Sequence, residues 1–336
     1  MEQKSSYRVY SSITEKDVEW LWYPYIPYGK ITLLQGDPGD GKSTFMLNLS
    51  ACLTNGSKLP DGTAIDKPEN VIYQCAEDSF SDTIKPRLIQ AGADCSRVAF
   101  VEDEDMSLSI TDSRIENAVR DFGARLLILD PIQAFISQDG DMQSASRMRS
   151  LMRKLSETAE KYHCAIVLIG HMTKASGGKN LYRGLGSIDI AAIARSVLMI
   201  SRDTEEPQIR YMFPVKASLA PEGCAIGFIF DSESGFHWIG KCNLGKREVY
   251  TTGKNSTSKK EKAKSLLKVM LSVEDLPSND IFERMEQIGI KEKTVRIAQK
   301  ELEIVAYQNH RTWYWHLPDD KSMETETNFE NEQEEQ

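Results

Sequence analysis

Short runs of aliphatic residues alternate with amphipathic stretches along the first half of the chain. Continuous apolar runs predict buried strands at 31–34, 71–76, 126–129 and 165–169, and a shorter strand at 98–101. The segments between them carry apolar residues at helical spacing and predict helices at about 45–52, 79–90, 113–122 and 142–162. Strands that alternate with helices form a sheet covered on both faces. The pattern therefore predicts an α/β fold with a mostly parallel central sheet.

The pattern changes after Lys174, where short β-rich runs replace the alternation of strands and helices. These runs predict further strands at 197–201, 208–215, 226–231 and 235–239. Their connections are short and polar, so we expect them to extend the sheet as antiparallel strands.

A separate small unit follows a polar linker at 251–260. Apolar spacing predicts helices at 260–271, 279–287 and 291–303, with Ser278 as the N-cap of the second helix. Two β runs then flank Asn309-His310-Arg311, as in a hairpin. Three helices followed by a hairpin indicate a winged helix-turn-helix, and we expect Trp313 and Trp315 to fill its core.

These changes divide the chain of 336 residues into a polar lead-in, an α/β domain, a linker, a winged-helix domain and an acidic tail. The predicted boundaries are 1–19, 20–250, 251–260, 261–318 and 319–336. The tail holds eight acidic residues and one lysine, a net charge of −7 out of the −9 of the whole chain. Because the tail dominates, the overall charge says little about partners, and we expect the tail to be disordered.

Cysteine usage and hydropathy point to a reducing compartment. The six cysteines form no C-x-x-C pair, and several lie in apolar runs, as buried thiols do. The first residues are polar and charged rather than a signal peptide, and no apolar run approaches the length of a membrane span. We therefore expect a cytoplasmic protein with no membrane partner and no cysteine metal site.

The first predicted strand runs directly into Gly36-x-x-x-x-Gly41-Lys42-Ser43, and a helical pattern follows. Strand, glycine-rich turn and helix are the context of a phosphate-binding P-loop. Its backbone N–H groups and helix dipole attract phosphate, the lysine reaches the β- and γ-phosphates, and the serine hydroxyl ligates Mg²⁺. The sequence thus predicts ATP and Mg²⁺ as ligands. The expected contacts are Gly36, Asp37, Pro38, Gly39, Asp40, Gly41, Lys42, Ser43 and Thr44.

Three polar residues follow other predicted strands at the edge where ligands of such sheets bind. Asp130 comes after four aliphatic residues, and we expect it to hold Mg²⁺ through water. Glu77 is placed to orient and deprotonate the attacking water, and His171 to sense the γ-phosphate. Each alone has a structural alternative, such as a solvated turn or a buried histidine. Behind a P-loop, the set predicts one catalytic site.

An aromatic segment, 20–28, precedes the first core strand. We favour the interpretation that it covers one face of the core, with stacking on adenine as the alternative.

The motifs together resemble the RecA-like ATPases, in which the glutamate follows the second core strand. Gly36 to Ser43, Gln74 to Asp78, Leu127 to Pro131 and Ile169 to Lys174 resemble the RepA-type hexameric replicative helicases of mobile elements. The similarity spans about residues 20 to 240. It implies a RecA-like P-loop NTPase core, a homo-oligomeric ring that is usually hexameric, ATP held between subunits, and a helicase or related motor on single-stranded DNA.

The resemblance also implies a basic pair, Lys-x-Arg, that reaches across the subunit interface. Lys216 matches the lysine, whereas Ser218 stands where the arginine is expected. Arg210, Arg202 or Arg195 could replace it, and the sequence does not choose among them. Arg87, behind Glu77, is a further candidate phosphate contact, with a solvated helix position as the alternative.

DNA contacts are expected from two places. Rings of this kind contact DNA through channel loops, which here match 133–146 and 172–185 and carry Lys174, Lys179 and Arg183. A solvated loop is the alternative. On the third helix of the small unit, Val295, Ala298 and Leu302 form an apolar stripe opposite a basic face of Lys293, Arg296 and Lys300. That face suits duplex DNA, and docking of a replication protein is the alternative.

The leading hypothesis is a RepA-like, DNA-dependent ATPase of a plasmid, phage or integrated element. A recombination or repair ATPase of the RadA kind is the second hypothesis. The third is a DNA-binding regulator that ATP switches without translocation, which Ser218 and the winged helix favour. A small-molecule kinase is less favoured, because the sequence has no evident acceptor lid.

Overall fold

The computed structural model describes residues 7–102, 107–136, 145–171, 188–203, 206–231, 235–242 and 259–318. The chain divides into two compact units, each considered by itself. The first comprises Met1–Ile200 and Met212–Gly223, and the second comprises Ser201–Tyr211 and Cys224–Gln336.

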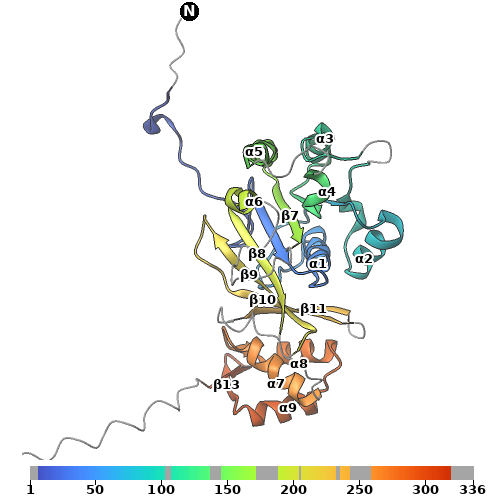
Figure 1. Cartoon of the computed structure of the whole chain (residues 1–336). Coiled ribbons are helices and arrows are strands. Elements are labelled where there is room, and N and C mark those ends of the chain that lie inside the picture. Colours follow the sequence, from blue (N-terminus) through green and yellow to red (C-terminus); the bar gives the residue numbers. More distant parts are fainter. Residues whose placement is uncertain are drawn as a thin grey trace, which may run out of the picture. The chain divides into compact units, whose positions relative to one another are not determined.

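A largely parallel sheet forms the centre of the first unit (Figure 1). Strand β3 (Ile31–Gly36) pairs in parallel with β7 (Ala165–His171) on one side and β8 (Ser196–Arg202) on the other. The order continues from β7 through parallel neighbours to the far edge, and β9 (Ile209–Ala217) lies next to β8. Those parallel neighbours are β6 (Leu126–Asp130), β4 (Val71–Cys75) and β5 (Val98–Ala99). The predicted α/β class is confirmed.

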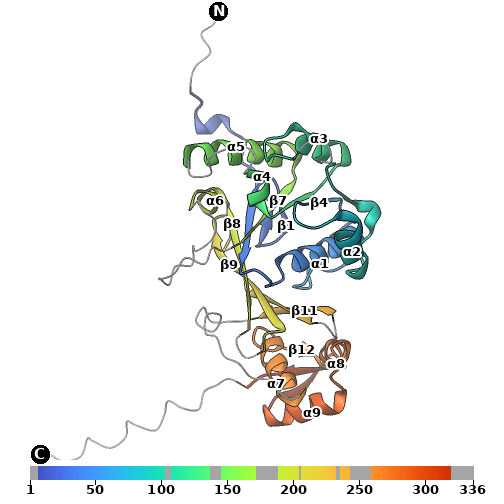
Figure 2. The ribbon, with the colours of Figure 1, turned by 45° about the vertical axis from the view of Figure 1, so that its right-hand side comes forward.

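Helices cover both faces of this sheet (Figure 2). One face and its helices share a continuous apolar core that includes Leu33, Leu127 and Leu168. Those helices are α3 (Ser113–Phe122), α4 (Ile132–Ile136), α5 (Ala145–Tyr162) and α6 (Ile188–Ile193). Helix α1 (Lys42–Asn55) packs against β3 and β4, and α2 (Lys85–Gln90) packs against α1. Alternate strand residues face opposite sides, which is why these strands are apolar throughout.

The aromatic segment forms a small antiparallel hairpin, β1 (Trp20–Trp22) and β2 (Ile26–Pro27), after a 3-10 turn, η1 (Tyr10–Ser12). Trp22 and Tyr25 are almost fully buried, with ring centroids 4.7 Å apart, and Trp22 stacks on Phe45 of α1 at 6.3 Å. Burial takes these rings out of reach of a ligand and confirms that the segment covers the core.

The helical segment expected at 79–90 is present, but its first part, η2 (Phe80–Ile84), is a π-helical turn that α2 follows directly. One local prediction in the first unit is wrong. Strand β8 runs parallel to β3 rather than antiparallel. A helical crossover through α6 returns the chain to the amino end of the sheet, and such crossovers join parallel strands. A second 3-10 turn, η3 (Cys95–Arg97), precedes β5.

The second unit combines a β-hairpin with a helical bundle. Strands β10 (Ala225–Asp231) and β11 (Gly235–Cys242) pair antiparallel, as predicted. An ion pair of 3.7 Å joins Lys262 to Asp231, and Arg284 donates to the Ile239 carbonyl at 2.6 Å. These contacts tie the helices to the hairpin.

The helices of this unit are α7 (Lys259–Met270), α8 (Ser278–Gln287) and α9 (Glu292–Glu301), close to the predicted ranges. The small sheet has the order β12-β14-β13, with β12 (Leu276–Pro277), β13 (Val305–Asn309) and β14 (Thr312–His316). Ser278 is the first residue of α8 and not its N-cap, because the preceding Pro277 is held in β12 opposite Tyr314.

Trp315 fills the core of the second unit, where its ring meets Phe282 edge-on at 5.2 Å. Trp313 is 52% exposed, so its predicted burial is wrong. It pairs with Gln308 only one step from the hairpin turn, whereas Trp315 pairs further back, with Leu276 and Ala306.

The packing of Trp22 generates a stability prediction. Trp22→Ala should lower the free energy of unfolding of the first unit by about 3–5 kcal/mol, because it opens a cavity beside Phe45. Denaturant unfolding followed by circular dichroism measures this loss. The neighbouring Tyr23 is 54% exposed, so Tyr23→Ala should cost about 1 kcal/mol or less. Equal losses for the two variants would contradict the assignment of Trp22 to the core.

Candidate nucleotide site

The glycine-rich loop lies between β3 and α1 in the conformation that phosphate binding requires. Gly39 and Gly41 have φ values of 81° and 90°, and Gly41 is the N-cap of α1. Gly36 allows close backbone approach, because a Cβ there would lie 2.5 Å from the Ile200 carbonyl oxygen. The first N–H groups of α1, which has no side-chain cap, are thus available to an anion.

Lys42 is buried inside this loop, with 4% of its surface exposed. Its ammonium donates to the carbonyl oxygens of Gly36 at 2.8 Å and Asp37 at 2.9 Å. Burial lowers the pKa of Lys42, while nearby Asp40 and Asp130 oppose that shift. Asp40 in turn accepts from the Asp37 N–H at 3.0 Å, which closes the loop. The ammonium is therefore held among oxygen acceptors that phosphate oxygens could replace.

Asp130 is the last residue of β6 and is almost fully buried. Its Oδ2 accepts a hydrogen bond of 2.6 Å from the hydroxyl of Tyr73 on β4. The Ser43 side chain, the other predicted magnesium ligand, lies beside the Tyr73 hydroxyl. Burial, followed by the charge of Asp130, raises the pKa of Tyr73 well above its usual value. The phenol therefore stays protonated and acts as a donor.

The sequence analysis did not identify Tyr73. It lies in the middle of an apolar strand, where a tyrosine is ordinarily a core residue. One signal was present, because Tyr73 and Cys75 share one face of β4, and Cys75 pairs with Asp130.

Glu77 is the second residue after β4 and is exposed to solvent, so water has access to its carboxylate. The charge of Glu77 acts to raise the pKa of Lys42, so Glu77 lies near the phosphate loop. The Ala76 N–H donates to the Asp130 carbonyl at 3.0 Å and fixes where the chain leaves the strand. Arg87 forms an ion pair of 2.9 Å with Asp78, the residue after Glu77.

His171 is the last residue of β7 and pairs in register with Gly36, so its backbone lies next to the start of the phosphate loop. Its side chain lies outside the described part of the structure. The predicted DNA contacts Lys174, Lys179 and Arg183 also lie outside the described residues, as does much of the segment 133–146.

Lys216 lies near the end of β9, and its ammonium is engaged within its own chain. It donates to the carbonyl oxygens of Ala191, Ala192 and Ala194 at 3.0, 3.0 and 2.8 Å, at the end of α6. Burial lowers the pKa of Lys216, and the charge of the nearby Arg195 adds to the shift.

Two arginines that could replace the one missing at Ser218 differ in their exposure to solvent. Arg210 is buried, and its guanidinium lies 4.8 Å from the centre of the Phe230 ring. Arg195 is exposed, and its carbonyl accepts from the Ser218 N–H at 3.0 Å. Arg195 makes no ion pair with a described residue and lies beside Ile31, whose carbonyl accepts its N–H at 3.1 Å.

Strand length separates Arg195 and Lys216 from the phosphate loop of their own chain. Ser196 pairs with Thr32 at the amino end of β3, whereas the loop follows Gly36 at the carboxyl end. The six residues of extended strand from Ile31 to Gly36 are separated by five steps, which span about 16 Å. Arg195 and Lys216 therefore lie near the amino ends of the strands, opposite the end that carries the phosphate loop.

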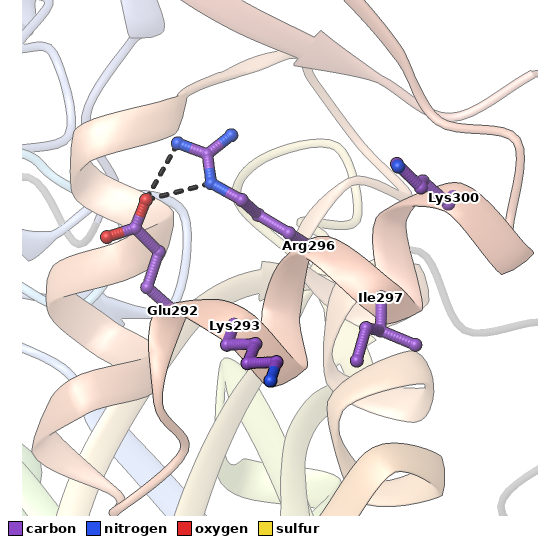
Figure 3. Close-up of a pocket in the computed structure, with 5 residues that line it drawn as sticks. All are labelled: Glu292, Lys293, Arg296, Ile297 and Lys300. Atoms are coloured by element: carbon purple, nitrogen blue, oxygen red, sulfur yellow. Dashed lines mark hydrogen bonds and ion pairs between the residues drawn. The ribbon is translucent and has the colours of Figure 1, made fainter.

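In the second unit, the predicted basic face of α9 is exposed (Figure 3). Lys293, Arg296, Ile297 and Lys300 line a pocket with Glu292. Arg296 pairs with Glu292 at 2.7 Å and lies 4.9 Å from the Phe282 ring centre, whereas Lys293 and Lys300 form no ion pair with a described residue.

The described residues contain no cluster of histidine, cysteine, aspartate and glutamate suited to a metal ion. They also contain no helix with the length and apolar character to cross a membrane.

Comparison with known proteins agrees with this geometry. The family described as AAA domain matches residues 10–177, which is half of the chain. The DNA repair protein RadA of Streptococcus pyogenes is 33% identical over 148 residues, which cover 44% of this chain and 28% of RadA. RadA of Bacillus subtilis is 28% identical over 148 residues, with the same coverage. RadA of Streptococcus pneumoniae is 31% identical over 149 residues, which cover 44% of this chain and 31% of RadA.

The chain thus spans less than a third of the length of these relatives. The phosphate loop, the strand ends and the family match lead to one conclusion: the chain belongs to the AAA domain family and has a RecA-like P-loop ATPase core.

Proposed function

We propose that this protein is a DNA-dependent ATP hydrolase that works as a ring of identical subunits. One observation supports the proposed hydrolysis of ATP. The carboxyl ends of β3, β4 and β6 bring the phosphate loop, Glu77 and Asp130 to one edge of the sheet. The buried Lys42 and the carboxylate Asp130 supply the charges that a nucleoside triphosphate and a divalent cation require.

In the proposed reaction, water attacks the γ-phosphorus of ATP, the bond to the β-phosphate oxygen breaks, and ADP and phosphate leave. Glu77 orients the water and accepts its proton, which its solvent-exposed position after β4 allows. Lys42 turns from the loop carbonyls to the β- and γ-phosphate oxygens, and the backbone N–H groups of residues 41–44 hold the phosphates.

The residues also suit Mg²⁺, because Ser43 and Asp130 both present oxygen ligands close to the Tyr73 hydroxyl. When bound, Mg²⁺ would neutralise charge on the phosphates. Ser43 would contribute its hydroxyl, and Asp130 its carboxylate through water.

A neighbouring subunit is proposed to complete the site. Lys216 and Arg195 lie at the edge of the sheet opposite their own phosphate loop, which supports a role toward another copy of the chain. Head-to-tail packing of identical subunits brings two different edges together and generates rings. Lys216 is held by its own α6, so we assign the stabilising guanidinium to Arg195 beside it.

DNA is proposed as the partner on two grounds. The matched relatives are named as DNA repair proteins, and the chain resembles the RepA-type helicases in its motifs. We favour movement along single-stranded DNA, with duplex DNA at α9 of a winged helix-turn-helix. The relatives named RadA favour a second candidate, a recombination or repair ATPase. Strand displacement on forked DNA separates the two, because only the helicase should open the fork.

The role of Glu77 generates the first functional prediction. Glu77→Gln should lower ATP turnover by about 10²–10⁴, because the general base is lost, while ATP affinity changes less than about threefold. Phosphate release with and without single-stranded DNA measures turnover, and DNA should raise it in the unaltered protein. Asp82→Asn, at another exposed acid after β4, is the control and should match the unaltered protein. Full turnover after Glu77→Gln would overturn the mechanism, and turnover indifferent to DNA would overturn the coupling.

The shared site generates a prediction for mixed rings. Arg195→Ala should bind ATP but hydrolyse it poorly, as should Glu77→Gln. Mixing the two in equal amounts should restore up to about a quarter of normal turnover, because about one interface in four joins an intact Glu77 to an intact Arg195.

The matched control mixes Glu77→Gln with Lys42→Ala, whose defects lie in the same half of the site. That mixture should remain inactive. Failure of the Arg195→Ala mixture to recover, with mixed rings confirmed by native mass spectrometry, would place the whole site in one chain.

The basic face of α9 generates a prediction about salt. Lys293→Ala and Lys300→Ala should each weaken binding of the full chain to duplex DNA. Each should also reduce the slope of log affinity against log salt by about 1, because one phosphate contact is lost. Fluorescence anisotropy across a range of salt concentrations measures this slope. Lys268→Ala, at an exposed lysine of α7, is the control. An unchanged slope in both α9 variants would exclude phosphate contacts there.

A further inference from the structure

A buried phenol lies between two side chains that come from different elements. Tyr73 is in the middle of β4 and only 1% exposed. Its hydroxyl donates to Asp130 Oδ2 on β6 at 2.6 Å, and the Ser43 side chain at the start of α1 lies beside it. Three segments that are distant in sequence therefore meet at one hydroxyl group.

Strand register explains how the contact arises. Tyr73 pairs with Ile128, and Cys75 pairs with Asp130, so Tyr73 and Asp130 lie two register positions apart on the same face of the sheet. Helix α1 packs against β4 and brings Ser43 to this point. The side chain of Tyr73 is long enough to reach the strand end, where a shorter residue on the same face would stop below it.

The contact has a consequence for Asp130, which is only 4% exposed. A buried carboxylate is stable only when hydrogen bonds or cations satisfy it. Tyr73 supplies such a bond and selects one orientation of the carboxylate, and Ser43 lies beside the same phenol oxygen. The two groups thus face one point before any ligand binds.

We propose that Tyr73 is a positioning residue that holds Ser43 and Asp130 in the arrangement required for Mg²⁺ to bind with the nucleotide. This inference rests on the proposed ATPase function and deepens it. Tyr73 touches neither the nucleotide nor the cation. Its effect is pre-organisation, so its loss acts on the magnesium requirement rather than on recognition of the phosphates by the loop.

The test is Tyr73→Phe in the full chain, which removes one oxygen and keeps the ring. Binding of a fluorescent ATP analogue is titrated at increasing Mg²⁺ and, separately, in excess EDTA. Affinity in EDTA should change by less than about twofold, because Lys42 and the loop are intact. The Mg²⁺ concentration for half-maximal enhancement of binding should rise about tenfold, equivalent to about 1.4 kcal/mol.

Tyr211→Phe is the matched control. Tyr211 is also buried and donates to an aspartate, Asp203, at 2.9 Å, but it belongs to the second unit. Both variants lose a buried bond to a carboxylate, so similar losses of thermal stability are expected. Only Tyr73→Phe should change the magnesium requirement.

The possible outcomes are distinct. If Tyr73→Phe shows the normal magnesium requirement, the positioning role is wrong and the proposed function stands. If the unaltered protein shows no nucleotide binding that depends on Mg²⁺, the proposed function itself fails. Tyr73→Leu, which also lacks the hydroxyl, provides a second test if the phenylalanine variant does not fold. The same increase in both variants would assign the effect to the hydroxyl, and an unchanged requirement in either would overturn it.

Discussion

Parallel pairing of β3, β7, β6 and β4 is the constraint on which the candidate site depends. Parallel strands in register end at the same edge of the sheet. Residues that follow different strands therefore lie close together in space, although they are far apart in sequence. Gly36 pairs with His171, and Cys75 pairs with Asp130. The phosphate loop, Glu77 and Asp130 therefore converge through backbone hydrogen bonding, and the side chains need only have the right chemistry.

That chemistry requires two opposite charges to be buried near one another. Lys42 and Asp130 are each 4% exposed, and neither forms an ion pair with the other in the described structure. Lys42 is satisfied by the loop carbonyls, and Asp130 is satisfied by Tyr73. Such separate partners keep the two charges apart, whereas a direct pair would close the space that phosphate and cation need. The loop carbonyls and the tyrosine thus satisfy the two charges separately.

The structure also indicates which features could be predicted from sequence. The phosphate loop is contiguous, and its glycines, lysine and serine have fixed spacing, so it could be located to the residue. Asp130 and Glu77 follow apolar runs and could be placed by the rule for strand ends. Tyr73 could not, because its role depends on the register between β4 and β6. The bonds from Lys216 to α6 depend on a fold contact between segments 22 to 25 residues apart. Ser278 and Trp313 were misplaced because small-sheet pairing decides their surroundings.

The two ends of β3 carry different groups, and this difference supports the proposed head-to-tail packing of subunits. A phosphate-binding loop follows its carboxyl end, and Arg195 with Lys216 lies beside its amino end. In the proposed ring, these two cations would meet the triphosphate held by another copy, whose negative charge attracts them. Because the two surfaces lie at different ends of the strand, such a contact would be heterologous and would repeat around the ring. Nucleotide binding would then strengthen the subunit interface, and hydrolysis, which removes the γ-phosphate, would weaken it. In this arrangement the same strand that positions one site also sets how subunits respond to the next.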